Sequence, residues 1–240
     1  LLFSSKGKVY WLKTYEIPEA SRTSRGRPLV NLLPLDEGER ITAMLQVDLE
    51  ALRKQAAEGD EELDDAEGLV IEHDDVDDVE GDDDSDEKDE PTGAYIFMAT
   101  AKGTVKKTPL VQFSRPRTSG LIALKLEEGD TLIAAAVTDG AQEVMMFSDG
   151  GKVIRFKESK VRIMGRNARG VRGMRLPEGQ RIISMLIPEP DAQILTASVR
   201  GYGKRTAMEE FPRRGRGGQG VIAMVTNERN GPLVGAVQVL

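Results

Sequence analysis

The residues with the clearest potential for chemistry are lysines and arginines grouped in short, glycine-containing segments. Four such segments occur, at 22–26, 115–120, 166–170 and 213–220. Guanidinium and ammonium groups neutralise phosphate, and arginine can donate two parallel hydrogen bonds to it. Glycine beside them lets backbone N–H groups approach an anion. We therefore expect a surface that binds a polyanion through its phosphates, independently of base sequence and with a steep dependence on salt.

The expected phosphate contacts are the basic residues of these segments, together with those in the hairpins that precede them. They are Arg22, Arg25, Arg27, Lys102, Lys106, Lys107, Arg115, Arg117, Lys152, Arg166, Arg169, Arg172, Arg200, Lys204, Arg205, Arg213, Arg214 and Arg216. A single basic cluster is explained equally well as a solvated surface. Four clusters at one position per repeat favour a bound ligand, because a circular array would place them around one rim.

The elements that position these segments belong to an internal repeat. A glycine with basic and small neighbours follows an apolar run at Gly7, Gly103, Gly151 and Gly201, and we call these four the anchor glycines. The last three are 48 and 50 residues apart, whereas the first gap is 96 residues, one period plus an insertion. The final glycine of the basic segment follows its anchor by 19, 17, 19 and 19 residues. A turn then precedes an apolar strand, at Glu37-Gly38, Glu128-Gly129, Glu178-Gly179 and Asn230-Gly231.

Each repeat is typical of short β-strands. The segment 153–157 carries β-branched and aromatic residues, and the segment 181–187 is a largely apolar run that ends before Pro188. About four strands per fifty residues is the size of a propeller blade. The sequence therefore predicts an all-β fold, a β-propeller of four-stranded blades whose apolar runs and methionines form its core.

An acidic block masks a basic protein. The net charge is −7, but residues 48–90 carry −19 and the remaining residues +12. We expect one domain of blades from 1–47 and 93–240, interrupted by an acidic insertion at 48–92. A short helix over 49–57 could open the insertion, and from Gly59 onwards we expect disorder because like charges repel and little apolar surface is available. The insertion either competes with phosphate for the basic rim or is a solvated spacer.

The sequence lacks the residues that other kinds of chemistry would need. The chain has no cysteine and one histidine, His73, which excludes thiolate chemistry and a site built from several histidines. Asp82, Asp84 and Asp86 have the spacing of a calcium loop, but the sixth position is Glu87 where that loop needs glycine. The phosphate-binding loop motif of nucleoside triphosphatases does not occur in the sequence. We expect no catalytic residue and no metal site in this chain.

Several short stretches of sequence, which we call strings, resemble those of one family. They are 15–22, 26–35, 101–108, 153–159 and 201–206. They resemble the C-terminal DNA-wrapping domain of the A subunit of bacterial DNA gyrase, a type IIA DNA topoisomerase. The resemblance covers the whole chain except the acidic block, and the strings are more specific than a general propeller pattern.

The resemblance implies a six-bladed pinwheel in which blades exchange strands and duplex DNA wraps around a basic rim, in support of ATP-dependent negative supercoiling. The family's first blade carries a Gln-Arg-Arg-Gly-Gly-Lys-Gly box. That box would lie upstream of Leu1, and the segment 213–220 resembles it only in composition. We therefore expect a fragment that lacks the first and last parts of the ring.

For the whole enzyme, the resemblance implies Mg and ATP used through other domains, and an A2B2 heterotetramer with the B subunit of gyrase. It also implies a location in the cytoplasm, in association with the nucleoid. The fragment itself is expected to be non-catalytic and to carry no cofactor.

Two alternatives remain at this point. A protein-interaction propeller would need exposed aromatic or apolar patches, whereas the loops are rich in Arg, Lys and Gly and only 5% of the residues are aromatic. The C-terminal domain of the A subunit of topoisomerase IV is a closer rival, with degenerate repeats. The regular repeats and the strings 19–22 and 30–33 favour gyrase.

Overall fold

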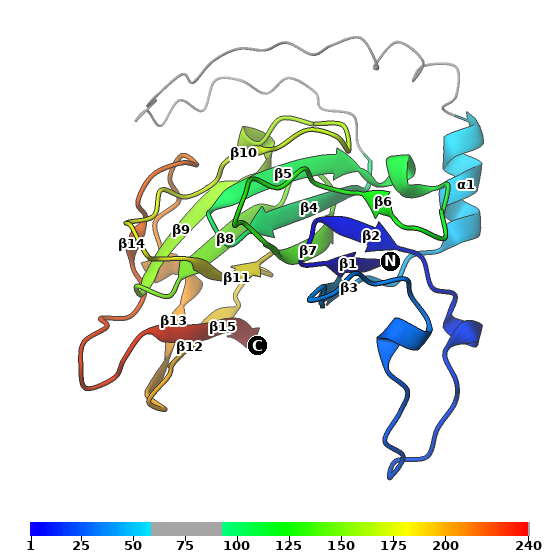
Figure 1. Ribbon diagram of the computed structural model, residues 1–240. Coiled ribbons are helices and arrows are strands. Elements are labelled where there is room, and N and C mark those ends of the chain that lie inside the picture. Colours follow the sequence, from blue (N-terminus) through cyan, green and yellow to red (C-terminus); the bar gives the residue numbers. More distant parts are fainter. Residues whose placement is uncertain (59–92, 240) are drawn as a thin grey trace.

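A computed structural model describes residues 1–58 and 93–239. These residues form four antiparallel sheets, which follow one another across the molecule in chain order (Figure 1). In the first sheet the order is β3 (Ile41–Met44), β1 (Leu2–Ser4), β2 (Lys8–Tyr10) and β6 (Leu121–Ile122). In the second it is β10 (Val171–Arg172), β5 (Thr104–Pro109), β4 (Tyr95–Thr100) and β7 (Leu132–Thr138). The predicted all-β fold is confirmed.

The third and fourth sheets continue this pattern. The third has the order β11 (Ile182–Leu186), β8 (Glu143–Ser148), β9 (Lys152–Lys157) and β14 (Val221–Ile222). The fourth has the order β13 (Gly203–Ala207), β12 (Gln193–Ser198) and β15 (Leu233–Val239) within the described residues. The strands predicted over 153–157 and 181–187 correspond to β9 and β11.

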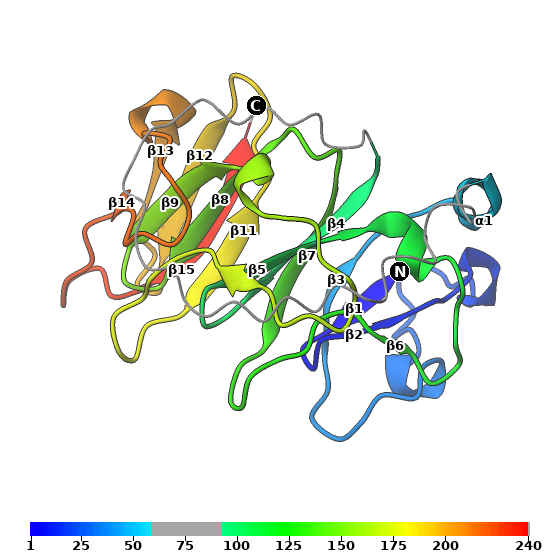
Figure 2. The same ribbon diagram turned by 90° about the horizontal axis from the view of Figure 1, so that it is seen from above.

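Neighbouring repeats exchange strands. The two-residue strands β6, β10 and β14 each come from one repeat and complete the sheet of the repeat before it, pairing with β2, β5 and β9. At the opposite edges of the sheets, β3 contacts β7, β7 contacts β11, and β11 contacts β15. These four strands therefore form the inner side of the array, and the exchanged strands lie along its outer edge. Figure 1 labels all three exchanged strands, and Figure 2 shows the same array from above.

The hairpin turns explain the anchor glycines. In the second sheet, the N–H of Gly103 donates to the Thr100 carbonyl at 3.1 Å, and the Thr100 hydroxyl accepts the N–H of Thr104 at 3.1 Å. Gly103 has φ +89°, which L side chains rarely adopt, and a Cβ there would lie 2.5 Å from the carbonyl oxygen of Met174. Glycine is thus required both by the turn and by the chain that follows the exchanged strand.

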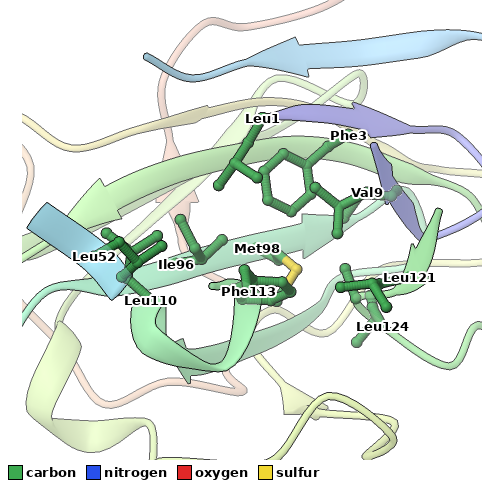
Figure 3. Close-up of a cluster of buried hydrophobic side chains, with 12 residues drawn as sticks. Leu1, Phe3, Val9, Leu52, Ile96, Met98, Leu110, Phe113, Leu121 and Leu124 are labelled. Atoms are coloured by element: carbon green, nitrogen blue, oxygen red, sulfur yellow. The ribbon is translucent and has the colours of Figure 1, made fainter. Parts of the chain in front are cut away.

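The core lies between successive sheets, and central strands such as β4 and β8 are buried on both faces. In β4, Ile96 and Met98 face the cluster shared with the first sheet, and Phe97 and Ala99 face the cluster shared with the third. One aromatic pair marks each junction: Phe3–Phe113, Phe97–Phe156 and Phe147–Phe211, with ring centroids 6.2, 6.4 and 6.4 Å apart. Figure 3 shows the first of these clusters.

Helix α1 (Leu49–Glu58) opens the segment expected as an acidic insertion. Its first turn is capped by Asp48, whose Oδ1 accepts the N–H of Glu50 at 2.9 Å and that of Ala51 at 3.1 Å. Leu52 is 2% exposed and belongs to the first core cluster (Figure 3). The predicted helix is confirmed, and because Leu52 buries apolar surface, the folded domain extends past the predicted boundary at residue 47.

The expectations for the rest of the insertion fall on residues 59–92. The residues expected to be disordered, the aspartates with calcium-loop spacing and His73 all lie outside the described residues. Within the described residues, no helix is long and apolar enough to cross a membrane.

Candidate nucleic-acid interface

Three of the four basic segments lead directly into the exchanged strands. Segment 115–120 precedes β6, 166–170 precedes β10, and 213–220 precedes β14. Each segment therefore crosses from its own repeat to the outer edge of the preceding sheet. Their final glycines have φ of +77°, +98° and +71°, at Gly120, Gly170 and Gly220.

These glycines let the segments lie close to the sheet. A Cβ on Gly170 would lie 2.5 Å from the Val105 carbonyl oxygen, and one on Gly220 would lie 2.2 Å from that of Val153. Any other residue would push the segment away from the sheet edge. The repeated glycine of each basic segment thus fixes where its arginines emerge.

Consecutive basic segments are joined along the outer edge by backbone hydrogen bonds. The N–H of Lys125, just beyond β6, donates to the Ala168 carbonyl at 3.4 Å. The N–H of Arg175, just beyond β10, donates to the Gly218 carbonyl at 2.9 Å. The side chains of Lys125 and Arg175 are exposed. They therefore stand between one basic segment and the next and fill the gaps in the row of positive charge.

We call this row the basic band. It comprises Arg115, Arg117, Lys125, Arg166, Arg169, Arg172, Arg175, Arg213, Arg214 and Arg216. All of these residues are exposed except Arg166, which is half-buried. Lys125 and Arg175 were missed in the sequence analysis, although both occupy the fifth position after the final glycine of a basic segment.

Arg166 and Arg216 have guanidinium groups that are partly enclosed by the protein. Burial, followed by repulsion from Arg117, lowers the pKa of Arg166. Burial and the neighbouring Arg162 lower the pKa of Arg216. The Arg216 guanidinium donates from Nε to the Lys160 carbonyl at 2.8 Å and from Nη1 to the Arg172 carbonyl at 3.2 Å. These bonds hold Arg216 against the neighbouring segment of the band.

Arg213 is held by a carboxylate. Glu143 Oε1 lies 3.2 Å from Arg213 Nε, and Glu143 Oε2 accepts a hydrogen bond from Arg155 Nε at 2.6 Å. Nη1 of Arg155 donates to the carbonyls of Met208 and Phe211, at 3.0 and 3.1 Å. Glu143 therefore neutralises part of the charge at this end of the band while Arg155 fixes the start of the segment.

Lys106 and Lys107, which were expected to contact phosphate, do not reach the surface. Both are in β5 and are 0% exposed. The Lys106 ammonium donates to backbone carbonyls, and the Lys107 ammonium lies 5.2 Å from the centroid of the Tyr95 ring. The charges suggested a surface strand, but β5 lies inside its sheet, with both faces covered by neighbouring blades.

The first basic segment differs from the others. Arg22, Arg25 and Arg27 are exposed on a loop between β2 and β3, which projects from the first sheet (Figure 1). In place of an exchanged strand, the loop continues into a 3₁₀ turn, Leu29–Asn31. Gly26 has no atom within 4 Å of the position a Cβ would take. The three arginines are therefore solvent-accessible, but no sheet edge aligns them with the basic band.

The remaining predicted residues belong to the hairpins. Lys102 is exposed and donates to the Glu128 carbonyl at 2.6 Å, and Arg200 is exposed and donates to the Glu228 carbonyl. Lys152 Nζ lies 3.4 Å from Gln219 Oε1, which places it beside the last basic segment. On β13, Lys204 and Arg205 are exposed. Within residues 1–58 and 93–239, no group of three or more His, Cys, Asp or Glu could hold a metal ion.

Comparison with known proteins matches this repeat to one family. Residues 1–48, 94–139, 142–189 and 192–239 match the family described as "DNA gyrase C-terminal domain, beta-propeller". The chain belongs to this family. The four matched stretches correspond to the four sheets, and the resemblance to the gyrase C-terminal domain drawn from the sequence is confirmed.

Curated relatives agree with this assignment. The A subunit of DNA gyrase from Pseudomonas aeruginosa is 76% identical over 244 residues, which cover 100% of this chain and 26% of the relative. The A subunit of DNA gyrase from Escherichia coli is 48% identical over 239 residues, with 100% of this chain and 23% of the relative covered. The chain thus spans about a quarter of the length of these gyrase proteins.

Solved structures share the fold. The C-terminal domain of DNA topoisomerase IV superposes with a TM-score of 0.75 at 26% identity, covering 100% of this chain and 62% of that one. A DNA gyrase A C-terminal domain gives 0.71 at 23% identity, covering 100% and 64%. The pinwheel architecture is therefore common to both kinds of enzyme, and the sequence relatives place this chain in the gyrase family.

Proposed function

We propose that this chain binds duplex DNA along the basic band, without sequence preference, and bends the DNA around the outer edge of the sheets. The observation that carries this proposal is the continuity of the band. Three basic segments and the two side chains between them follow one edge of successive sheets, joined by backbone hydrogen bonds. DNA presents phosphates at regular intervals, so a row of this kind can neutralise many of them together.

Bending is part of the proposal because the band is spread over several sheets. Smoothly bending a site of about 20–30 base pairs costs on the order of 1–6 kcal/mol. One cluster of two or three arginines gains little from bent DNA, whereas clusters on consecutive sheets gain new phosphate contacts only if the DNA follows them. The net charge of +12 outside residues 48–90 supports this interpretation.

Within the whole enzyme, we propose that the chain supplies the wrapped DNA for ATP-dependent negative supercoiling. Strand cleavage, Mg binding and ATP hydrolysis would belong to other parts of the A subunit or to the B subunit, in an A2B2 heterotetramer associated with the nucleoid in the cytoplasm. The chain contributes no catalytic group to this scheme. Its role is to hold phosphates through arginine and lysine.

A titration of duplex DNA tests the proposal. The 240-residue chain is added to labelled duplexes of unrelated sequences at 50 to 200 mM salt, and the affinity is followed by anisotropy. If about six or more phosphates are contacted, affinity falls by about a thousandfold or more over this range. Similar affinities for all sequences are expected. Salt-insensitive binding, or binding of one sequence alone, would contradict the proposal.

A second candidate function, protein recognition, is favoured by the projecting loop of the first repeat. Tyr15, Ile17 and Val30 are 78%, 51% and 62% exposed there. Exposed apolar groups of this kind suit a protein contact better than a phosphate. Replacing all three with serine would leave the salt dependence of DNA binding unchanged if the loop serves protein recognition, and would weaken DNA binding if the loop belongs to the DNA path.

A further inference from the structure

One buried ammonium group lies directly beneath the basic band. Lys106 Nζ donates to three backbone carbonyl oxygens, those of Ala123 at 2.8 Å, Arg166 at 2.5 Å and Ala168 at 3.1 Å. Ala123 immediately follows the exchanged strand β6, and the other two acceptors belong to the basic segment 166–170. A single side chain therefore connects the end of the exchanged strand β6 to the basic segment that leads into the next exchanged strand, β10.

The geometry uses the full capacity of a protonated lysine. An ammonium group has three N–H donors, and here three carbonyls accept them. A neutral amine has only two N–H bonds and a lone pair, which would face the third carbonyl. Burial, with added repulsion from Arg166, lowers the pKa of Lys106 to about 7. Arg166 is in turn repelled by Arg117. The charged state that satisfies all three carbonyls is thus most populated below neutral pH.

In the first and third repeats, the same position lies against the basic segment without a charge, and in the fourth it is Lys204, which is exposed on β13. The third residue after the anchor glycine is Tyr10 in the first repeat and Ile154 in the third. The Tyr10 ring lies 2.6 Å from where a Cβ on Gly120 would be, and Ile154 Cδ1 lies 3.9 Å from the corresponding point on Gly218. The fold accepts an uncharged side chain here, so the ammonium of Lys106 is specific to the segment 166–170.

We propose that Lys106 is a positioning residue for phosphate binding by Arg166 and Arg169, acting through the backbone of segment 166–170 without touching DNA itself. This proposal rests on the proposed function. Two of the four residues from Arg166 to Arg169 have carbonyls bonded to Lys106, so the ammonium sets the direction in which both guanidinium groups leave the backbone. Without the ammonium, the segment keeps the bonds on either side of it, from the Met164 N–H to the Lys107 carbonyl and through the pairing of β10 with β5. It loses the two bonds between them, so the two charges leave the line of the basic band.

A double-mutant cycle tests the coupling. Lys106→Met in the 240-residue chain should weaken duplex binding about three- to tenfold at fixed salt and make the salt slope shallower. In an Arg166→Ala/Arg169→Ala background the same substitution should have almost no further effect, because the charges it positions are already absent. In an Arg214→Ala background, its effect should remain in full. Equal effects of Lys106→Met in all three backgrounds would overturn the proposal.

The pH dependence separates positioning from general destabilisation. Between pH 6 and 8.5 the affinity of the unsubstituted chain should fall as Lys106 loses its proton, and Lys106→Met should remove this dependence. Ile154→Met is the matched control at the same position of the next repeat and should keep it. His73→Gln should also keep it, since His73 is the only histidine. If Lys106→Met does not fold, Lys106→Gln replaces it in both experiments.

The outcomes distinguish this proposal from the function on which it rests. If the unsubstituted chain binds no DNA, the proposed function fails. If it binds DNA with the expected salt dependence but its affinity is constant from pH 6 to 8.5, or falls identically in Lys106→Met, the positioning role of Lys106 is wrong while DNA binding stands.

Discussion

The backbones of Gly103 and Met174 lie in direct contact, although they belong to consecutive repeats. The N–H of Met174 donates to the Gly103 carbonyl at 3.1 Å, and a Cβ on Gly103 would lie 2.5 Å from the Met174 carbonyl oxygen. Gly7 with Leu124 and Gly151 with Met224 make the same contact. In the first three sheets, the hairpin turn therefore also binds the chain that leaves the exchanged strand.

Gly103→Ala should destabilise the protein by about 3 kcal/mol, because the methyl group meets a backbone carbonyl and the residue keeps a positive φ. Gly201→Ala is the matched control. Gly201 has φ +80° but no atom within 4 Å of its Cβ position, so about 1 kcal/mol from backbone strain alone is expected. Urea unfolding of both variants measures the difference. Equal destabilisation would show that the close contact with Met174 does not matter.

Arg175→Ala should weaken duplex DNA binding and reduce the magnitude of the salt slope by about 0.9 for each phosphate that is no longer neutralised. The reason is its place in the basic band, where its backbone meets segment 213–220. Arg181→Ala is the control, since Arg181 is exposed but precedes the inner strand β11. Loss of affinity in Arg181→Ala as large as in Arg175→Ala would place DNA elsewhere on the protein.

Glu143→Gln should change stability and affinity in opposite directions. The carboxylate holds Arg155, whose side chain is 14% exposed, and its loss should destabilise the fold by about 1–3 kcal/mol. The same substitution removes a negative charge beside Arg213 and should tighten DNA binding about twofold at low salt. Thermal unfolding and anisotropy measure the two effects. Weaker DNA binding in the folded variant would contradict this expectation. It would mean that the main effect of Glu143 on DNA binding is to position Arg213, and that neutralising its charge matters less.

Tyr10 should ionise only at high pH. Burial, together with hydrogen bonds from its hydroxyl to Glu39 at 3.0 and 3.2 Å, raises the pKa of Tyr10 to about 12. A raised pKa stabilises the folded state below the unfolded value of about 10, and this contribution is lost as the pH rises toward 12. Ultraviolet titration of the unsubstituted chain and of Tyr10→Phe should differ by one late-ionising group. Identical titrations above pH 10 would contradict the buried hydroxyl.

The periodic features of the fold could be predicted from the sequence because they depend on local backbone requirements. The anchor glycines, the glycines that end the basic segments and the turn glycines all have positive φ, which few other residues tolerate. Strand exchange does not follow from periodicity. The same sequence pattern would allow β6 to pair within its own repeat or with the repeat before it. It was expected only from the family resemblance, and the pairing of β6 with β2 confirms it.

The basic band could be predicted only in part, because charge does not by itself report burial. Lys106 and Lys107 have the composition of a surface strand, but the neighbouring blades cover both faces of β5. Lys125 and Arg175 lie outside the basic segments of the sequence, and they join the band because the chain beyond each exchanged strand contacts the next basic segment. Both errors concern contacts between repeats, which no local pattern contains.

The bending of DNA around the outer edge tests the central claim most directly. A duplex of about 30 base pairs, a length whose bending has a substantial energetic cost, carries a donor dye at one end and an acceptor at the other. Saturation with the 240-residue chain should bring the ends together and raise energy transfer. The variant Arg117→Ala/Arg169→Ala/Arg214→Ala, with one arginine removed from each segment of the band, should bind more weakly and, at saturation, bend the DNA less. Saturated binding with no change in energy transfer, or equal bending by the triple variant, would contradict the account.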